Sequence, residues 1–200
     1  MANIFGKVIY VIKMKFKIGI PATHEYKEEM MEEYANEYGC NVLIETGTYK
    51  GDMLVQVYEL FEYLASVEIS SQLYEEAKKR FENDIKIHLY NGNSSDKLPQ
   101  MIDDAKGKID NARIIFWLDG HYSGGVTEKA EKDTPIVEEL LAIKKQGIDD
   151  GVILIDDARC FKHKGEYIDY PTIKSLKKIV HEQWENAAIQ VKNDIIRIVL

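Results

Sequence analysis

Short apolar runs alternate with amphipathic segments along most of this chain. Continuous runs predict buried strands, and an alternating run at 85–90 predicts a further strand. Between them, apolar residues recur three and four positions apart, which is typical of helices packed on one face. The predicted strands cover 41–44, 63–69, 85–90, 113–118 and 151–155, and the predicted helices cover 25–38, 52–62, a segment starting at Ser70 or Ser71, about 97–105, a segment starting at 134–135, and 171–184.

The last two predicted strands, 187–191 and 195–200, are joined by only three residues. A link this short permits only an antiparallel hairpin, because parallel neighbours need a long crossover. Strands that alternate with helices otherwise form a parallel sheet covered on both faces. The sequence therefore predicts an α/β fold with a mostly parallel, seven-stranded sheet and an antiparallel C-terminal hairpin.

Residues 1–38 are expected to precede this sheet as an N-terminal strand or hairpin followed by a helix. Charged and apolar residues alternate from Lys13 to Ile18, as in an edge strand that could pair across a homodimer. From 25 to 38 an aromatic and apolar stripe indicates a packed helix, with Gly39 as its C-terminal cap. Residues 39–200 are expected to hold the sheet, within one compact domain overall.

The composition narrows the classes of function. The net charge of -8 argues against a protein that coats nucleic acid. No apolar run is long enough to span a bilayer, so no membrane segment is expected. Two cysteines without a secretion signal favour reduced thiols and a cytoplasmic protein.

Polar residues follow nearly every predicted strand. In open α/β sheets, ligands bind outside the carboxyl ends of the strands. Gly47, just after Glu45, can adopt backbone angles closed to other residues and lets a ligand approach the main chain. Glu68 lies about twenty residues further on, where an acid can accept hydrogen bonds from a ribose diol. The alternative for Glu68 is a solvated acid at a strand end.

Three aspartates follow two other buried strands: Asp119 after one, and Asp156 and Asp157 after the next. If these strands are neighbours, the three carboxylates converge, and Mg²⁺ would relieve their repulsion. The alternative is that one aspartate caps a helix while another pairs with Arg113 or Arg159.

His121 is the candidate general base, because it lies two residues past Asp119 and imidazole titrates near neutrality. His163, between two lysines, is better explained as a surface histidine. The segment Ser123-Gly124-Gly125 is either a lid or a turn.

Taken together, this pattern resembles the class I S-adenosylmethionine-dependent methyltransferases, over about residues 40 to 200. Glu45-Thr46-Gly47-Thr48 is similar to their first motif, although Tyr49 stands where a second glycine is usual. The resemblance implies a Rossmann-like methyltransferase fold with S-adenosylmethionine as cofactor. The residues it implies at the cofactor are Glu45, Gly47, Thr48, Tyr49, Glu68, Ile69, Asn93, Ser94 and Asp119.

Within that class, Leu118-Asp119-Gly120 and Ile155-Asp156-Asp157 resemble metal-dependent sugar O-methyltransferases of the macrocin and mycinamicin type. This resemblance implies that Asp119, Asp156 and Asp157 hold Mg²⁺ and that the acceptor is a hydroxylated small molecule such as a sugar. The resulting hypothesis is O-methylation, with His121 and Asp119 as the catalytic residues.

Two rival hypotheses stay open at this stage. One is a non-catalytic protein that binds a nucleotide or sugar on the same fold, which the missing second glycine favours slightly. The other is an NAD-dependent oxidoreductase, against which the chain offers only Gly47 and Gly51 for the Gly-x-Gly-x-x-Gly fingerprint.

Overall fold

The structure is a computed structural model that describes residues 20–120 and 134–200. Within these ranges the chain forms a seven-stranded sheet in the order β3-β2-β1-β4-β5-β7-β6. Only β7 runs against its neighbours, since β5 and β6 both pair with it antiparallel and all other pairs are parallel. The strands are β1 (Val42–Thr46), β2 (Tyr63–Glu68), β3 (Ile87–Asn91), β4 (Ile114–Leu118), β5 (Val152–Ile155), β6 (Ala188–Lys192) and β7 (Ile195–Val199).

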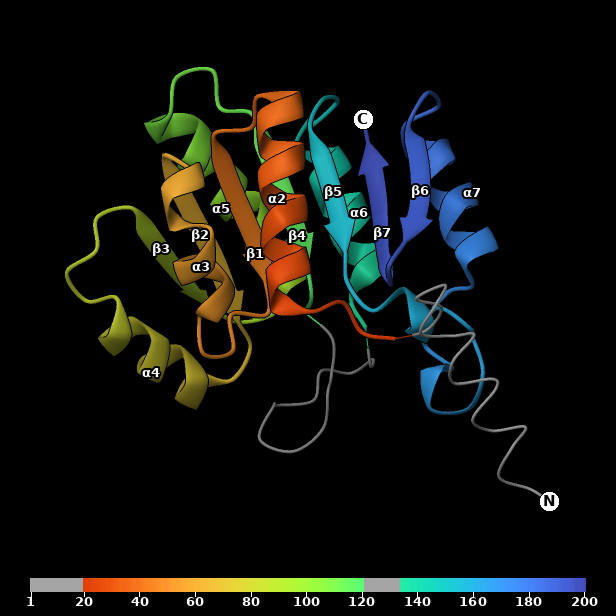
Figure 1. The fold of residues 1–200 in the computed structure, drawn as a ribbon, viewed down its shortest axis with the longest axis horizontal. Coiled ribbons are helices and arrows are strands. Elements are labelled where there is room, and N and C mark those ends of the chain that lie inside the picture. The colour runs from red at the N-terminus through yellow and green to blue at the C-terminus, as the bar shows by residue number, and fades with distance from the viewer. Residues whose placement is uncertain (1–19, 121–133) are drawn as a thin grey trace.

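Helices cover both faces of the sheet, as the sequence predicted (Figure 1). Alternate residues along β1 separate the two faces, because Val42 and Ile44 pack with α5, α6 and α7, whereas Leu43 packs with α2 and α3. The helices are α2 (His24–Tyr38), α3 (Asp52–Gln56), α4 (Ser71–Arg80), α5 (Ser94–Lys108), α6 (Ile136–Lys145) and α7 (Ile173–Gln183).

Several helix boundaries follow from capping. Ser70 begins α4 by accepting a hydrogen bond from the amide of Leu73, and Gly39 ends α2 in the left-handed conformation, both as predicted. Helix α5 starts three residues earlier than expected, because the Asn93 side chain accepts from the amide of Ser95 and caps the helix. The predicted turn at 91–94 is therefore in part a helix cap.

Two other predicted boundaries were wrong. Helix α3 ends at Gln56 and gives way to a 3₁₀ turn, where the amide of Leu60 bonds to the carbonyl of Val57. Ile85 lies outside β3 and is 91% exposed, because the Asp84 side chain accepts from the amide of Lys86 and bends the chain before the strand.

The predicted strand at 13–18 and the segment 123–125 lie outside the described residues. Among the described helices, none combines the length and the apolar character that crossing a bilayer requires.

Candidate functional site

The polar ends of β1, β2, β4 and β5 meet along one edge of the sheet, which we call the strand-end rim. Val67 and Leu118 flank Thr46 from opposite sides, so Glu68 and Asp119 follow directly on either side of β1. Two strand spacings separate such positions by roughly 10 Å. Asp156 lies one strand further along, where its amide bonds to the carbonyl of Leu118 at 3.1 Å. The sheet thus brings together the acids that the sequence placed at this edge.

Gly47 allows the loop after β1 to lie directly against the end of β4. Its φ is 89°, and a Cβ at this position would stand 2.7 Å from the carbonyl oxygen of Asp119. The amides of Gly47 and Thr48 both donate to the carbonyl of Val67, at 2.9 and 3.2 Å. These two amides therefore fix the loop to β2.

Tyr49 keeps the backbone conformation that a glycine would adopt at its place. Its φ is 48°, in the left-handed region, and its side chain is turned outward with 48% of the residue exposed. Its amide donates to Oε2 of Glu68 at 2.8 Å. Tyrosine at this position is therefore in a left-handed conformation, at a strain of about 1 kcal/mol.

Glu68 is buried and held by the main chain on both oxygens. Besides Tyr49, the amide of Ser70 donates to Oε1 at 2.9 Å. A carboxylate offers about four acceptor positions, so two remain for other donors. An oriented acid with two open acceptor positions is what recognition of a ribose diol needs. Ile69, the next residue, is half-buried.

Asn93 caps α5 and Ser94 begins it, shortly after the end of β3, and the resemblance implied that both residues contact the cofactor. The Asn93 side-chain oxygen is used in capping, since it accepts from both the amide and the hydroxyl of Ser95. Its amide nitrogen is the part of the side chain left for a ligand, while Ser94 is buried as the first residue of the helix.

Glu45 is only 2% exposed and takes part in a chain of side-chain hydrogen bonds. The Ser66 hydroxyl donates to Glu45 Oε2 at 2.6 Å, and lies 2.6 Å from the hydroxyl of Thr48. Burial raises the pKa of Glu45 to about 8, against the lowering effect of the Ser66 hydrogen bond. The nearby carboxylates of Asp119 and Glu68 raise this pKa further. Glu45 is therefore mostly a neutral acid at pH 7. Ser66 was missed from the sequence, because nothing in an apolar strand marks one inward serine.

Lys27 of α2 is the residue of the rim that sequence reasoning did not identify. Its ammonium forms an ion pair with Oδ2 of Asp156 and lies 5.3 Å from the centroid of the Trp117 ring. Burial lowers the pKa of Lys27, but the carboxylates of Asp156 and Asp119 outweigh burial and the net shift is upward. Lys27 therefore stays charged at neutral pH. A weak signal was present, because it is the single Lys or Arg of an acidic helix and lies four residues before the buried Met31.

The aspartates expected to hold Mg²⁺ have other partners. Asp156 accepts from Lys27 on Oδ2 and from the amide of Asp157 on Oδ1, the latter at 2.8 Å. Asp157 forms an ion pair with Arg159, which also pairs with Asp194 of the β6–β7 hairpin. This is the alternative that the sequence left open for Arg159.

No group of three or more histidine, cysteine, aspartate or glutamate side chains within 20–120 and 134–200 is arranged to bind a metal ion. A divalent cation about 4 Å from the Lys27 ammonium would be repelled by roughly 2 kcal/mol even in bulk water, and by more in a drier site. The arrangement of Asp119, Asp156 and Asp157 therefore does not fit the magnesium site that their sequence positions suggested.

Asp119 itself is half-buried, and its amide donates to the carbonyl of Thr46 at 3.1 Å. His121, the expected base, lies outside the described residues. His163 is exposed, in line with a surface role.

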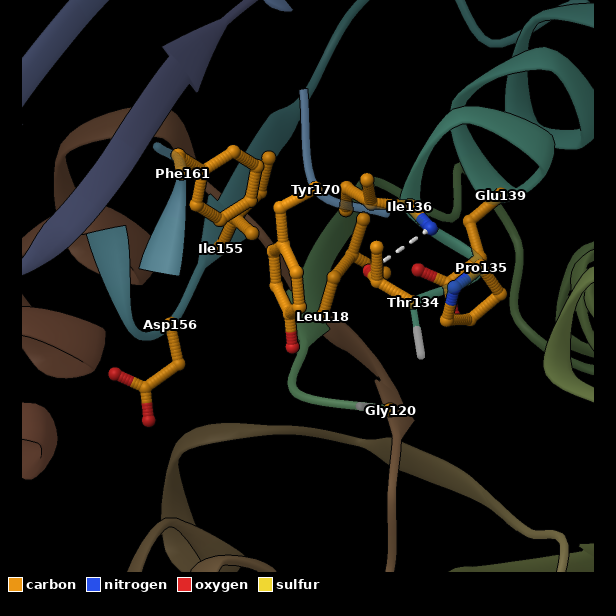
Figure 2. Close-up of a pocket in the computed structure, with 10 residues that line it drawn as sticks. All are labelled: Leu118, Gly120, Thr134, Pro135, Ile136, Glu139, Ile155, Asp156, Phe161 and Tyr170. Carbon is orange, nitrogen blue, oxygen red and sulfur yellow. Dashed lines mark hydrogen bonds between the residues drawn. The ribbon is translucent and has the colours of Figure 1, made fainter. Parts of the chain in front are cut away.

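A small pocket lies between the ends of β4 and β5 and the start of α6 (Figure 2). Asp156 stands on one side and Thr134 on the other, with Tyr170 between them in this view. The Tyr170 ring meets Phe161 edge to face, with centroids 5.4 Å apart. The pocket volume of about 10 Å³ is the space of roughly one water molecule. It can receive one small polar group from a larger ligand.

No model of a known protein family matches the chain, and no curated protein matches its sequence. Solved structures do match. The SAH-bound methyltransferase PaMTH1 of Podospora anserina has a TM-score of 0.58 at 15% identity, over 100% of this chain and 96% of its own. An O-methyltransferase from Bacillus cereus in complex with SAH has a TM-score of 0.58 at 12% identity, over 97% of this chain and 90% of its own.

The N-methyltransferase NodS from Bradyrhizobium japonicum WM9, in complex with S-adenosyl-L-homocysteine (SAH), has a TM-score of 0.55 at 11% identity, over 92% of this chain and 90% of its own. Likenesses at these identities establish the fold and leave the acceptor atom open, since both O- and N-methyltransferases share it. The chain has the Rossmann-like methyltransferase fold, with a mostly parallel seven-stranded sheet that ends in an antiparallel hairpin.

Proposed function

We propose that this chain is an S-adenosylmethionine-dependent methyltransferase that acts on a hydroxyl oxygen of a small molecule. The observation that carries the proposal is Glu68, whose carboxylate is oriented by two main-chain amides at the end of β2. In this fold that position faces the groove outside the strand ends. Glu68 would bind the ribose hydroxyls of the cofactor with the acceptor positions that the amides leave open.

The charge of the strand-end rim also suits a sulfonium cofactor. Carboxylates at Glu68, Asp119 and Asp156 outnumber the one ammonium, Lys27, that lies among them. An excess of negative charge attracts a cation and raises its local concentration. A dinucleotide, which carries phosphates, would be disfavoured by the same charge.

Glu68 would hold the ribose of S-adenosylmethionine, and the cofactor would supply an electrophilic methyl group for the acceptor oxygen, with the sulfur as the leaving group. The protein has to align the oxygen with that methyl group and remove the hydroxyl proton. Asp119 is our candidate for accepting the proton, because it is a half-buried carboxylate at the end of β4. His121 is the second candidate.

The water-sized pocket beside Asp156 supports a hydroxyl as the reacting group, because it has room for one small polar group. We propose a hydroxylated small molecule, with sugars as the first class to test, and a cytoplasmic enzyme. A homodimer is part of the same proposal, through the N-terminal segment.

Magnesium is not part of the proposal, because Lys27 and Arg159 already pair with two of the three expected ligands.

Calorimetry with S-adenosylmethionine, SAH and NAD tests the proposal. We expect both methionine-derived ligands to bind, NAD to give no heat, and Glu68→Gln to weaken SAH binding about tenfold or more, since hydrogen bonds to a charged acceptor contribute roughly 1.5–3 kcal/mol. The exposed Glu75 of α4 offers the matched control, Glu75→Gln, which should bind SAH as the wild type does. Absence of SAH binding at millimolar ligand would refute the proposal. Transfer of a labelled methyl group to a panel of sugars and phenols then identifies the acceptor.

A further inference from the structure

The Lys27 ammonium occupies a central place among the acids of the strand-end rim. Helix α2 runs across the face of the sheet over β1 and β4 and brings Lys27 to the end of β5 (Figure 1). The side chain is 15% exposed and its partner Asp156 is 3% exposed, so the pair is largely removed from water. Its charge also acts on Asp119, Asp157 and Glu45. One lysine thus influences four carboxyl groups from three strand ends.

A buried ion pair between elements so far apart in sequence has a desolvation cost, and 129 residues separate Lys27 from Asp156. Packing alone would not require it, since Met30 and Met31 of the same helix already bury against the sheet. The ion pair between Lys27 and Asp156 is better explained by the other carboxyl groups nearby. Carboxylates that converge repel one another unless a cation lies between them. In this chain that cation is the ammonium group of the Lys27 side chain.

We propose that the Lys27 ammonium takes the place of a divalent cation at the acceptor, so that methyl transfer by this chain is metal-independent. This inference rests on the function proposed above. An ammonium has three N–H donors and one is directed to Asp156. A second donor can bind the acceptor oxygen and hold it in line with the methyl group, without taking up the proton. Lys27 is thus a positioning residue for the acceptor.

The competing explanation is that Lys27 only fastens α2 to the sheet. The two explanations differ in what happens when the charge is removed and the length of the side chain is kept. In Lys27→Met, Asp156 loses its ion pair and Asp119 loses a nearby positive charge, so both carboxylates attract a hard divalent ion more strongly. In Lys27→Arg the charge remains. A purely structural lysine would leave the affinity for Mg²⁺ unchanged in both variants.

The experiment titrates MgCl₂ into the full-length protein by calorimetry, with thermal shift as a second readout. For the wild type we expect no saturable Mg²⁺ binding below millimolar concentrations and the same SAH affinity with EDTA or with MgCl₂. Lys27→Met should bind Mg²⁺ at least about tenfold more tightly than the wild type, because a nearby positive charge has been removed. Lys27→Arg should behave as the wild type.

Lys144→Met is the matched control, because Lys144 also pairs with an aspartate, Asp149, but on the surface of α6. It should leave Mg²⁺ binding unchanged, which separates the local effect from the general attraction of an acidic protein. Tight Mg²⁺ binding by the wild type, or weaker SAH binding in EDTA, would overturn the inference even if Lys27→Met failed to fold. Equal Mg²⁺ affinity in Lys27→Met and the wild type would overturn it too. None of these results affects the proposed function, which fails only if SAH does not bind.

Discussion

At the end of β2, main-chain amides orient the carboxylate of Glu68, whereas at the end of β5 charged side chains pair with Asp156 and Asp157. Glu68 is oriented by the amides of Tyr49 and Ser70, which lie 19 and 2 residues away. Asp156 is paired with Lys27 across 129 residues, and Arg159 with Asp194 across 35. The first region depends on the course of the backbone, and the second depends on which helix docks over it.

This difference explains two observations. The first region accommodates a tyrosine at position 49, whereas the aspartates of the second region are not arranged as the resemblance to metal-dependent enzymes implied. Tyr49 adopts a left-handed conformation and contacts Glu68 through its main-chain amide, so this contact does not depend on its side chain. Asp119, Asp156 and Asp157 resemble a metal-binding set by residue type, yet Asp156 pairs with a lysine and Asp157 with an arginine. A sequence motif of aspartates does not reveal which charged side chains from other parts of the chain lie beside them in the fold.

The largest effect is expected for Glu45→Gln, because Glu45 lies where the two regions meet. Its pKa is raised to about 8 in the folded protein, so the folded state retains a proton that the unfolded chain releases above its ordinary pKa of 4.5. This contribution to stability is complete below pH 4.5 and is lost as the pH rises toward 8. Glu45→Gln should therefore gain stability relative to the wild type by up to about 4 kcal/mol between pH 5 and pH 8.

Urea unfolding of both proteins at pH 5, 6.5 and 8 measures this difference. The same substitution at the exposed Glu75 should give a difference that does not change with pH. A flat result for Glu45→Gln would mean that the buried carboxyl is ionised in the folded protein. In that case a nearby cation would keep the Glu45 carboxylate charged, and Lys27 is the candidate.

A smaller effect is expected from separating the two regions sterically. Gly47→Ala places a methyl group 2.7 Å from the Asp119 carbonyl at a positive φ, so the loop after β1 has to move away from β4. We expect a loss of about 3 kcal/mol, of which roughly 1 kcal/mol is backbone strain. Gly147→Ala isolates the strain, because Gly147 has a φ of 68° with no atom within 4 Å of the added Cβ.

Chemical unfolding and SAH calorimetry of both alanine variants make this comparison. Gly47→Ala should also weaken SAH binding, whereas Gly147→Ala should not. Equal losses of stability in the two variants would show that the contact between the loop and Asp119 is not tight.

The smallest effect concerns Tyr49. Restoring glycine removes left-handed strain of about 1 kcal/mol but adds a similar entropy cost in the unfolded chain. Tyr49→Gly should therefore change the free energy of unfolding by less than about 1 kcal/mol and SAH affinity by less than about twofold. The amide that donates to Glu68 is kept in this variant. A large loss of SAH affinity would show that the Tyr49 ring, and not only its amide, contacts the cofactor.

The sequence by itself determined the fold and the position of Glu68 at the end of a strand. Apolar periodicity set the strands and helices, the short link at 192–194 imposed the hairpin, and Glu68 was expected at the end of a strand and is the last residue of β2. These features are local, because burial patterns, tight turns and strand ends depend on residues close together in the chain.

Only the tertiary structure decided what the remaining acids do. The partner of Asp156 is fixed by how α2 crosses the sheet, and Arg159, the partner of Asp157, is shared with Asp194 because the β6–β7 hairpin approaches the end of β5. The protonation of Glu45 depends on complete burial beside other carboxyl groups. Coulombic and desolvation energies depend on distance and surroundings in space, so the order of residues along the chain does not specify them.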